Sequence, residues 1–251
     1  MKRLSWLGLI ILISVSACSS NSGQKVEQNT EAGEINTTLG LAYLRTNDLN
    51  SAKEKLEKAL KQNPKSSFTN MAYALLLQKI EEPEKADQYF RTAIKLDPEN
   101  PEIRNNYGGF LCENKRYKEG VEQFIQAMNN PLYKTPQYAA DNIGNCYLKS
   151  GDLVRAEGYY RKALEIDKYF PQGLYHMARL TFLNQQYMGT RAYLQRFNAV
   201  AGDASPTLWL CYQVELELEN SIEANRCAEK LLKKFPDSKE ASQLSLIYDR
   251  K

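Results

Sequence analysis

The sequence predicts an all-α fold in which six helix-turn-helix repeats stack into a superhelix and a last helix caps the stack. Three observations support this prediction. A pattern of large and small residues recurs every 34 residues, glycine or alanine stands where paired helices must approach closely, and proline stands where the second helix of a repeat should end. Neighbouring hairpins of this kind bury one continuous core.

The first repeat, 33–66, shows the pattern most fully. Large side chains stand at its positions 7, 11 and 24, small ones at 8, 20 and 27, and proline at 32. In that order, these residues are Leu39, Tyr43, Leu56, Gly40, Ala52, Ala59 and Pro64. The small residues let helix backbones pack together and the large ones fill the seam. The pattern resembles the tetratricopeptide repeat.

The pattern recurs in five further windows, with a two-residue insertion after the second of them. They are 67–100, 101–134, 137–170, 171–204 and 205–238. The fifth repeat is degenerate because Thr190 and Phe197 stand where small residues are expected, and the sixth is recognisable mainly through Ala224 and Pro236. We expect residues 239–251 to form the capping helix. An unrelated helical bundle would need the same spacing to recur by accident in four consecutive windows.

The N-terminus has the layout of a secretory signal. Lys2 and Arg3 precede an apolar run that ends in small residues. The run is about 14 residues long, whereas a membrane-spanning helix needs roughly 20. The four residues that end at Cys18, VSAC, resemble the bacterial lipobox, in which the cysteine is lipidated and becomes the first residue of the mature chain. We therefore expect 1–17 to be a lipoprotein signal peptide, the alternative being an ordinary signal with an incidental cysteine.

Residues 18–32 are expected to be the lipidated cysteine and a flexible tether. From Ser19 to Ala32 the chain is almost wholly polar, with Val26 as its one sizeable apolar residue, so it cannot bury enough surface to order itself. Such a tether spans roughly 20 Å on average. Ser19 would be the second residue of the mature chain, and a serine at that position resembles the sorting signal of bacterial outer-membrane lipoproteins. This resemblance predicts a protein that is lipid-anchored to the periplasmic face of the outer membrane.

Charge and motif content exclude several classes of function. Without residues 1–17, 31 basic residues face 30 acidic ones, so no nucleic-acid footprint and no polybasic membrane patch is predicted. The single histidine, His176, has no companion ligands for a metal. The sequence contains no phosphate-loop, dinucleotide, zinc-protease or serine-hydrolase motif. We expect no enzymatic activity and no cofactor, with the acyl chains as the only membrane contact.

Four cysteines remain besides Cys18, an even number in a protein expected to mature in an oxidising compartment. Cys112 and Cys146 fall at similar heights on the first helices of neighbouring repeats, and a bridge between them would contribute about 4 kcal/mol. Cys211 and Cys227 fall on the two helices of the sixth repeat, where a bridge would contribute about 3 kcal/mol. The alternative for each pair is a small buried hydrophobic side chain.

The resemblance to tetratricopeptide repeats implies that the first helices line a concave groove. In the first two repeats, the groove-facing positions include five apolar residues suited to an amphipathic or extended segment of a partner. They are Leu41, Leu44, Phe68, Met71 and Leu75. The alternative is that some of them pack between hairpins.

The third repeat departs from the pattern at Gly109. Glycine inside a helix costs roughly 0.8–1.0 kcal/mol relative to alanine, and this one occupies a groove-facing position. A missing side chain would let the backbone of a partner come close, with Asn105 and Asn145 placed to hydrogen-bond an extended chain. The alternative is a glycine that serves helix packing only.

The lipobox, the six repeats and the segment NNYGGFLCENKRY at 105–117 together resemble the type IV pilus biogenesis and stability lipoproteins, the pilotins of the outer-membrane secretin. The resemblance covers essentially the whole mature chain, and Cys112 and Cys146 match a pattern in part of that family. It implies binding of secretin subunits, support of their multimerisation, and a role in pilus extrusion and twitching motility. A general periplasmic adaptor that docks cell-wall or outer-membrane assembly factors is the alternative function.

Overall fold

The computed structural model describes residues 22–248, and all regular elements in that range are helices. The predicted superhelix of six hairpins and a capping helix is confirmed. The hairpins are α1 (Ser22–Arg45) with α2 (Leu49–Gln62), α3 (Ser67–Lys79) with α4 (Pro83–Leu96), α5 (Pro101–Glu113) with α6 (Tyr117–Met128), α7 (Pro136–Ser150) with α8 (Leu153–Ile166), α9 (Pro171–Leu183) with α10 (Tyr187–Ala201), and α11 (Ser205–Glu217) with α12 (Ser221–Lys234). The cap is α13 (Lys239–Tyr248), which packs on α11 and α12.

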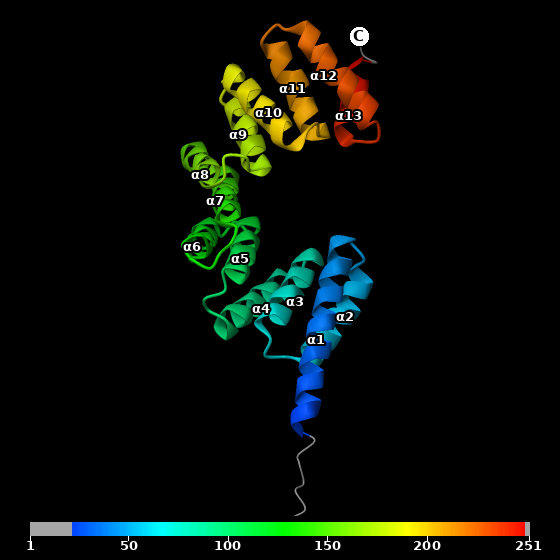
Figure 1. Ribbon diagram of the computed structural model, residues 1–251, viewed down its shortest axis with the longest axis vertical. Coiled ribbons are helices and arrows are strands. Elements are labelled where there is room, and N and C mark those ends of the chain that lie inside the picture. Colours follow the sequence, from blue (N-terminus) through cyan, green and yellow to red (C-terminus); the bar gives the residue numbers. More distant parts are fainter. Residues whose placement is uncertain (1–21, 249–251) are drawn as a thin grey trace, which may run out of the picture.

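The hairpins follow one another along a curved path, so the molecule has the shape of an arch with α1 near one end and α13 at the other (Figure 1). Each hairpin contacts the next one along the chain. The first helices of the N-terminal repeats also contact each other directly, α1 against α3, α3 against α5 and α5 against α7. This row of helices forms the wall on which the predicted groove residues lie.

A small residue at position 8 lies against a large one at position 24 within most hairpins. A Cβ atom added to Gly40 would lie 2.5 Å from Leu56 Cγ, and one added to Gly144 would lie 2.5 Å from Tyr160 Cδ1. Both large side chains are fully buried. The two helices of a hairpin therefore approach so closely that position 8 has no room for a side chain in these repeats.

The two C-terminal repeats keep the same packing with different residues. In the sixth repeat the sizes are exchanged, because Tyr212 holds position 8 and Ala228 holds position 24, and both are buried in one cluster. In the fifth, Thr190 replaces the expected small residue, and its hydroxyl lies 3.1 Å from that of Thr181 in the buried seam. Both replacements keep the core filled, and the hydroxyl that Thr190 brings into the seam is hydrogen-bonded.

The turn inside every hairpin contains one residue with a left-handed backbone, always the fifteenth residue of its repeat. Their φ angles are 60° at Asn47, 61° at Glu81, 63° at Lys115, 86° at Gly151, 59° at Gln185 and 56° at Glu219. The following amide closes the turn, as Glu82 N does on Leu77 O at 2.9 Å. This conformation ends the first helix and reverses the chain.

The structure corrects the predicted tether. Helix α1 begins at Ser22, so residues 22–32 of the segment 18–32 are helical rather than flexible. The segment contains good helix formers and no proline, and it continues a helix already fixed by packing, which removes the cost of nucleation. The predicted signal peptide, 1–17, and the predicted lipidation site, Cys18, lie outside the described residues. Within 22–248, no helix is both long enough and apolar enough to cross a membrane.

Leu39 is a second departure from the predicted pattern. It holds position 7, where a large residue should fill a seam, yet it is 42% exposed. The equivalent residue of the third repeat, Tyr107, is 4% exposed because α4 of the preceding repeat covers it and supplies Asp87 as the acceptor of its hydroxyl at 2.7 Å. The first repeat has no preceding hairpin in the described chain, so Leu39 stays uncovered.

Substitution of two helical glycines should separate packing from propensity. A Cβ at Gly120 would meet Cys112 Sγ and lie 2.8 Å from the carbonyl oxygen of Gly108, so Gly120→Ala should lower the free energy of unfolding by about 1–3 kcal/mol. Nothing lies within 4 Å of a Cβ at Gly158, so Gly158→Ala should raise it by up to about 1 kcal/mol. Urea unfolding followed by circular dichroism measures both, and a Gly120→Ala protein as stable as the parent would contradict the packing described above.

Candidate protein-binding groove

The five apolar residues predicted from the first two repeats line a single cleft. It has a volume of about 700 Å³ and lies on the row formed by α1, α3 and α5. Phe68 is 41% exposed, whereas Met71 is 6% exposed and also packs in the core beneath the cleft. Leu41, Leu44 and Leu75 are half-buried. The structure therefore divides these residues between the two expected roles. Met71 packs between hairpins and forms the floor of the cleft, whereas Phe68 offers apolar surface to a partner.

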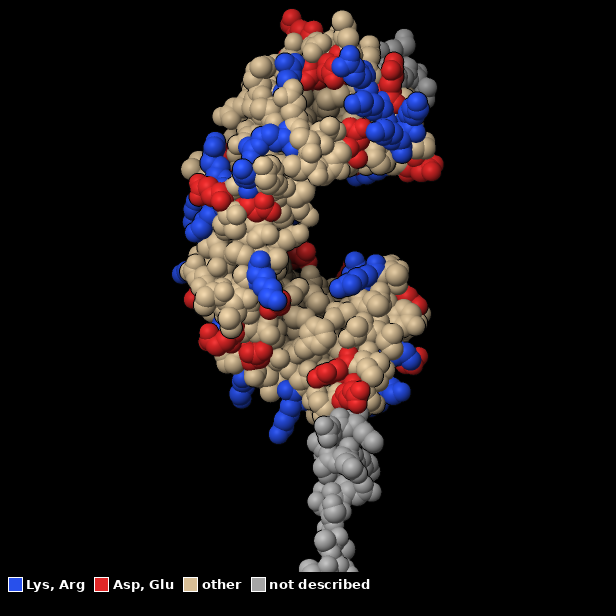
Figure 2. Space-filling model, in the orientation of Figure 1, with Lys and Arg blue, Asp and Glu red and all other residues tan. Residues whose placement is uncertain are grey.

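The rim of this apolar cleft carries charges of both signs. Arg45 and Lys79 supply two cations, and three glutamates face them, Glu81, Glu102 and Glu113. Figure 2 shows the same mixture of signs over much of the face in view, around the hollow that the arch encloses. The free-energy gain of a bound segment would thus come mainly from apolar contact, with single charges selecting its flanking residues.

Gln78 connects α3 to α5 at the end of the apolar cleft. Its Nε2 donates a hydrogen bond to Glu113 Oε2 at 2.5 Å. Its Oε1 is buried and, within the described residues, is a side-chain oxygen that accepts no hydrogen bond. A buried acceptor without a partner is costly, and the bond from Nε2 to Glu113 holds the Gln78 side chain in place between α3 and α5.

A second cleft, of about 360 Å³, continues the first along α5 and α7. Glu113 lines both clefts, which joins them into one groove. Gly109 lines the second cleft, and no atom lies within 4 Å of a Cβ added there. The alternative that Gly109 serves helix packing therefore does not fit the open space around it.

The structure changes the roles expected of the two asparagines. Asn145 lines the second cleft, but its Nδ2 donates to Asp141 Oδ2 at 3.2 Å and its Oδ1 accepts from the Tyr160 hydroxyl at 2.9 Å. Its amide is thus engaged inside the protein. Asn105 accepts a 3.1 Å bond from Asn142 Nδ2, and it is Asn142 that lines the cleft. Sequence position alone did not single out Asn142.

Asp141 is the centre of a buried polar network between α7 and α9. It is 4% exposed, and its Oδ1 lies 2.8 Å from His176 Nδ1, whose ring also packs on Tyr160. Burial, and to a smaller extent the charge of Asp141, raises the pKa of Tyr160 well above its usual value. No group of three possible metal ligands occurs in the described part of the chain. The network fixes the orientation of neighbouring repeats and leaves His176 without the surroundings of a metal ligand.

A second polar network holds α4 against α5 and the start of α6. Asp87 Oδ1 accepts hydrogen bonds from the Tyr107 hydroxyl at 2.7 Å and from Arg116 Nη1 at 2.6 Å. Burial and the bond to Asp87 raise the pKa of Tyr107 to about 12. Burial opposes ionisation of Asp87, but its hydrogen bonds from Arg91, Tyr107 and Arg116 outweigh this and lower its pKa. Tyr107 is therefore a neutral donor to an ionised carboxylate at neutral pH.

The structure joins both cysteine pairs named from the sequence. Cys112 on α5 and Cys146 on α7 are bonded with their Cα atoms 5.5 Å apart, and both residues line the second cleft. Cys211 on α11 is bonded to Cys227 on α12, with a Cα separation of 6.0 Å. The first bond fixes the distance between two helices that form the groove, and so limits changes in its width.

Comparison with known proteins agrees with the repeats and extends to the whole chain. Tetratricopeptide repeat models match residues 33–66, 69–100, 89–122 and 137–170. The type IV pilus assembly protein PilF of Pseudomonas aeruginosa is 29% identical over 238 residues, which cover 93% of this chain and 94% of PilF.

Two solved structures share both sequence and fold with the chain. The structure of Pseudomonas aeruginosa PilF superposes with a TM-score of 0.70 at 30% identity, over 87% of this chain and 99% of that one. The crystal structure of PilW, described as a widely conserved type IV pilus biogenesis factor, superposes with a TM-score of 0.73 at 30% identity. The match covers 84% of this chain and 97% of the PilW chain. The chain therefore belongs to the tetratricopeptide-repeat family of type IV pilus biogenesis factors that includes PilF and PilW.

Proposed function

We propose that this protein is an outer-membrane lipoprotein that acts as the pilotin of the type IV pilus secretin. It binds secretin subunits in its groove and promotes their assembly into multimers, and thereby supports pilus biogenesis and twitching motility. The observation that carries this proposal is the continuous groove, apolar on α1 and α3 and open at Gly109, in a member of a pilus-biogenesis family. The protein serves as a protein-binding scaffold, not as an enzyme.

The groove supports capture of a segment that is apolar at one end and extended at the other. Phe68 is 41% exposed, so covering its remaining surface would contribute about 1 kcal/mol, less than half of the gain for a fully exposed aromatic side chain. Beyond Gln78 and Glu113, the missing side chain at Gly109 leaves space for a peptide backbone. A segment with apolar residues followed by an extended stretch would fit both parts.

The anchor supplies location in this proposal. Three residues separate Cys18 from the start of α1, and three extended residues reach at most about 10 Å. Helix α1 is 24 residues long, which corresponds to about 36 Å. Lipidation at Cys18 would hold the groove near the periplasmic surface of the outer membrane, where secretin subunits assemble.

Substitution of Phe68 tests the apolar cleft. In a deletion strain complemented with Phe68→Asp, we expect a loss of heat-stable secretin multimers on gels, since a charge at this rim opposes apolar burial. Val154→Asp is the matched control, because Val154 is 84% exposed on α8 and lines neither cleft. If both variants and the deletion itself leave multimers unchanged, the pilotin role is wrong and the general adaptor role becomes the better account.

Substitution of Gly109 tests the open part of the groove. Gly109→Leu should weaken capture of purified secretin subunits about tenfold or more, a loss of at least about 1.4 kcal/mol. Gly158→Leu is its control, because both glycines lie in helices with nothing within 4 Å of an added Cβ. Neither change should lower the thermal midpoint. Equal capture by the two variants would contradict the placement of the partner backbone.

Replacement of Cys18 tests the anchor. Expressed behind an ordinary cleavable secretory signal in place of residues 1–17, the Cys18→Ser protein should lack the acyl mass in mass spectrometry and should fractionate with soluble periplasmic proteins. Two or three acyl chains give stable membrane attachment without further contact, so their loss should release the protein. A Cys18→Ser protein that still fractionates with the outer membrane would disprove anchoring through this residue.

A further inference from the structure

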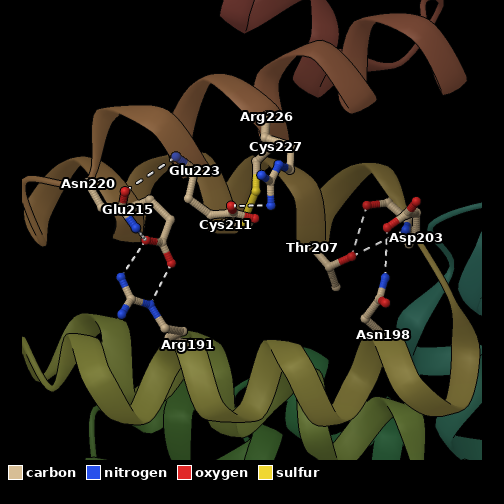
Figure 3. Close-up of a disulfide and its surroundings, with 11 residues drawn as sticks. Arg191, Asn198, Asp203, Thr207, Cys211, Glu215, Asn220, Glu223, Arg226 and Cys227 are labelled. Carbon is tan, nitrogen blue, oxygen red and sulfur yellow. Dashed lines mark hydrogen bonds and ion pairs between the residues drawn. A yellow bond between two sulfur atoms is a disulfide. The ribbon is translucent and has the colours of Figure 1, made fainter.

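A separate recess lies near the C-terminal end of the arch, between α10, α11 and α12. Its volume is about 440 Å³, within the range of sites that bind small ligands or short peptides. It shares no lining residue with either cleft of the groove. Figure 3 shows it as the gap between α10 on one side and the α11–α12 hairpin on the other.

The floor of the recess is apolar and fixed in place. Leu194 and Leu208 line it and are 7% and 5% exposed. The Cys211–Cys227 disulfide forms the wall between them and ties α11 to α12 (Figure 3). A ligand therefore meets apolar surface that is already organised, which reduces the entropy lost on binding.

Polar bridges close the recess at both ends. At one end, Arg191 on α10 donates from Nε to Glu215 Oε1 on α11 at 2.7 Å, and the Glu215 side chain is only 3% exposed. At the other, Asn198 Nδ2 donates to Asp203 Oδ1 at 2.7 Å. Figure 3 shows these two groups on either side of the disulfide. A polypeptide that lay along the recess would meet a bridge at each end and would have to bend out past it, so the geometry favours a chain end.

The length between the bridges sets the size of the ligand. Arg191 and Asn198 are seven residues apart on α10, which corresponds to about 10 Å along the helix. An extended chain advances about 3.3–3.6 Å per residue. The recess therefore holds about three residues of an extended peptide.

The three carboxylates that line the recess, Asp203, Glu215 and Glu223, each have a basic partner. Arg191 pairs with Glu215, Arg226 with Glu223, and Lys234 with Asp203. Lys230 also lines the recess. After the hydrogen bond from Lys234, the charge of Lys230 helps to lower the pKa of Asp203, but Lys230 is not within ion-pair distance of any described carboxylate. Figure 2 shows basic side chains gathered at this C-terminal end of the molecule. A carboxylate is the group that complements Lys230.

We infer that this recess binds the carboxyl-terminal end of a partner protein, with about three apolar residues over the floor of Leu194 and Leu208, beside the disulfide wall, and the terminal carboxylate at Lys230. The closed ends select a chain terminus, Leu194 and Leu208 select apolar side chains, and Lys230 selects the anion. This site is independent of the groove and of the proposed secretin binding.

Fluorescence anisotropy with defined peptides tests the inference on the detergent-solubilised full chain. The probe is a fluorescein-labelled peptide that ends in three leucines with a free carboxylate. Its C-terminally amidated form should bind about tenfold more weakly, the loss of one charge-assisted hydrogen bond. The same three leucines placed in the middle of a peptide should bind as weakly as the amide. Equal binding of the three peptides would overturn the inference.

Two lysines on α12 provide matched variants. Lys230→Glu should weaken the free-carboxylate peptide about tenfold and leave the amide nearly unchanged, because only the carboxylate contacts this side chain. Lys233→Glu makes the same change of charge at an exposed position on the same helix that does not line the recess, and should change affinity less than about twofold at physiological salt. An equal loss of affinity in the Lys230→Glu and Lys233→Glu proteins would show that only the net charge of α12 matters, which would contradict a carboxylate bound at Lys230. Weakened binding by Phe68→Asp would place the peptide in the groove and refute the site.

Discussion

The residues at positions 8 and 24 of a repeat touch, and this contact sets the spacing of the two helices in a hairpin. The stacking of successive hairpins builds on that spacing. Gly40 admits Leu56, and Gly144 admits Tyr160, at distances that leave no room for a methyl group. The close approach sets the angle and separation of the two helices. Successive hairpins then stack in one register, which brings the first helices into the continuous row that forms the groove. Without this contact the groove would have no fixed wall.

The size of a side chain can be read directly from the sequence. The backbone conformation of a turn residue often cannot. The repeat boundaries could be predicted because glycine, alanine and large residues recur at set positions. In the sixth repeat Tyr212 and Ala228 exchange the large and the small position, so the pair still consists of one large and one small buried side chain. The left-handed residue at position 15 gives no such signal, since only Gly151 is a glycine and the others include Glu81 and Lys115. The surrounding helices impose that conformation at an expected cost of roughly 1 kcal/mol each.

The same distinction explains the results at the groove. Leu41, Phe68 and their neighbours could be placed because repeat position determines which face of a helix a residue occupies. The hydrogen bonds of Asn145 could not, because Tyr160 reaches it from the second helix of the hairpin and Asp141 engages it on its own helix. The C-terminal recess depends on the gap between α10 and α12 and has no signature in either helix alone.

The two disulfides act at different levels of the arch. In a stack of repeats, each unit contacts only its neighbours, and stability is nearly a sum of repeat and interface contributions. Cys211–Cys227 lies within one hairpin and holds the wall of the recess, so its effect should remain local. Among the described residues, Cys112–Cys146 is the covalent bond that crosses an interface between repeats, and it does so where the groove opens at Gly109. The bond between Cys112 and Cys146 therefore holds the separation of α5 and α7 along the groove, whereas Cys211–Cys227 lies several helices away and does not act on that separation.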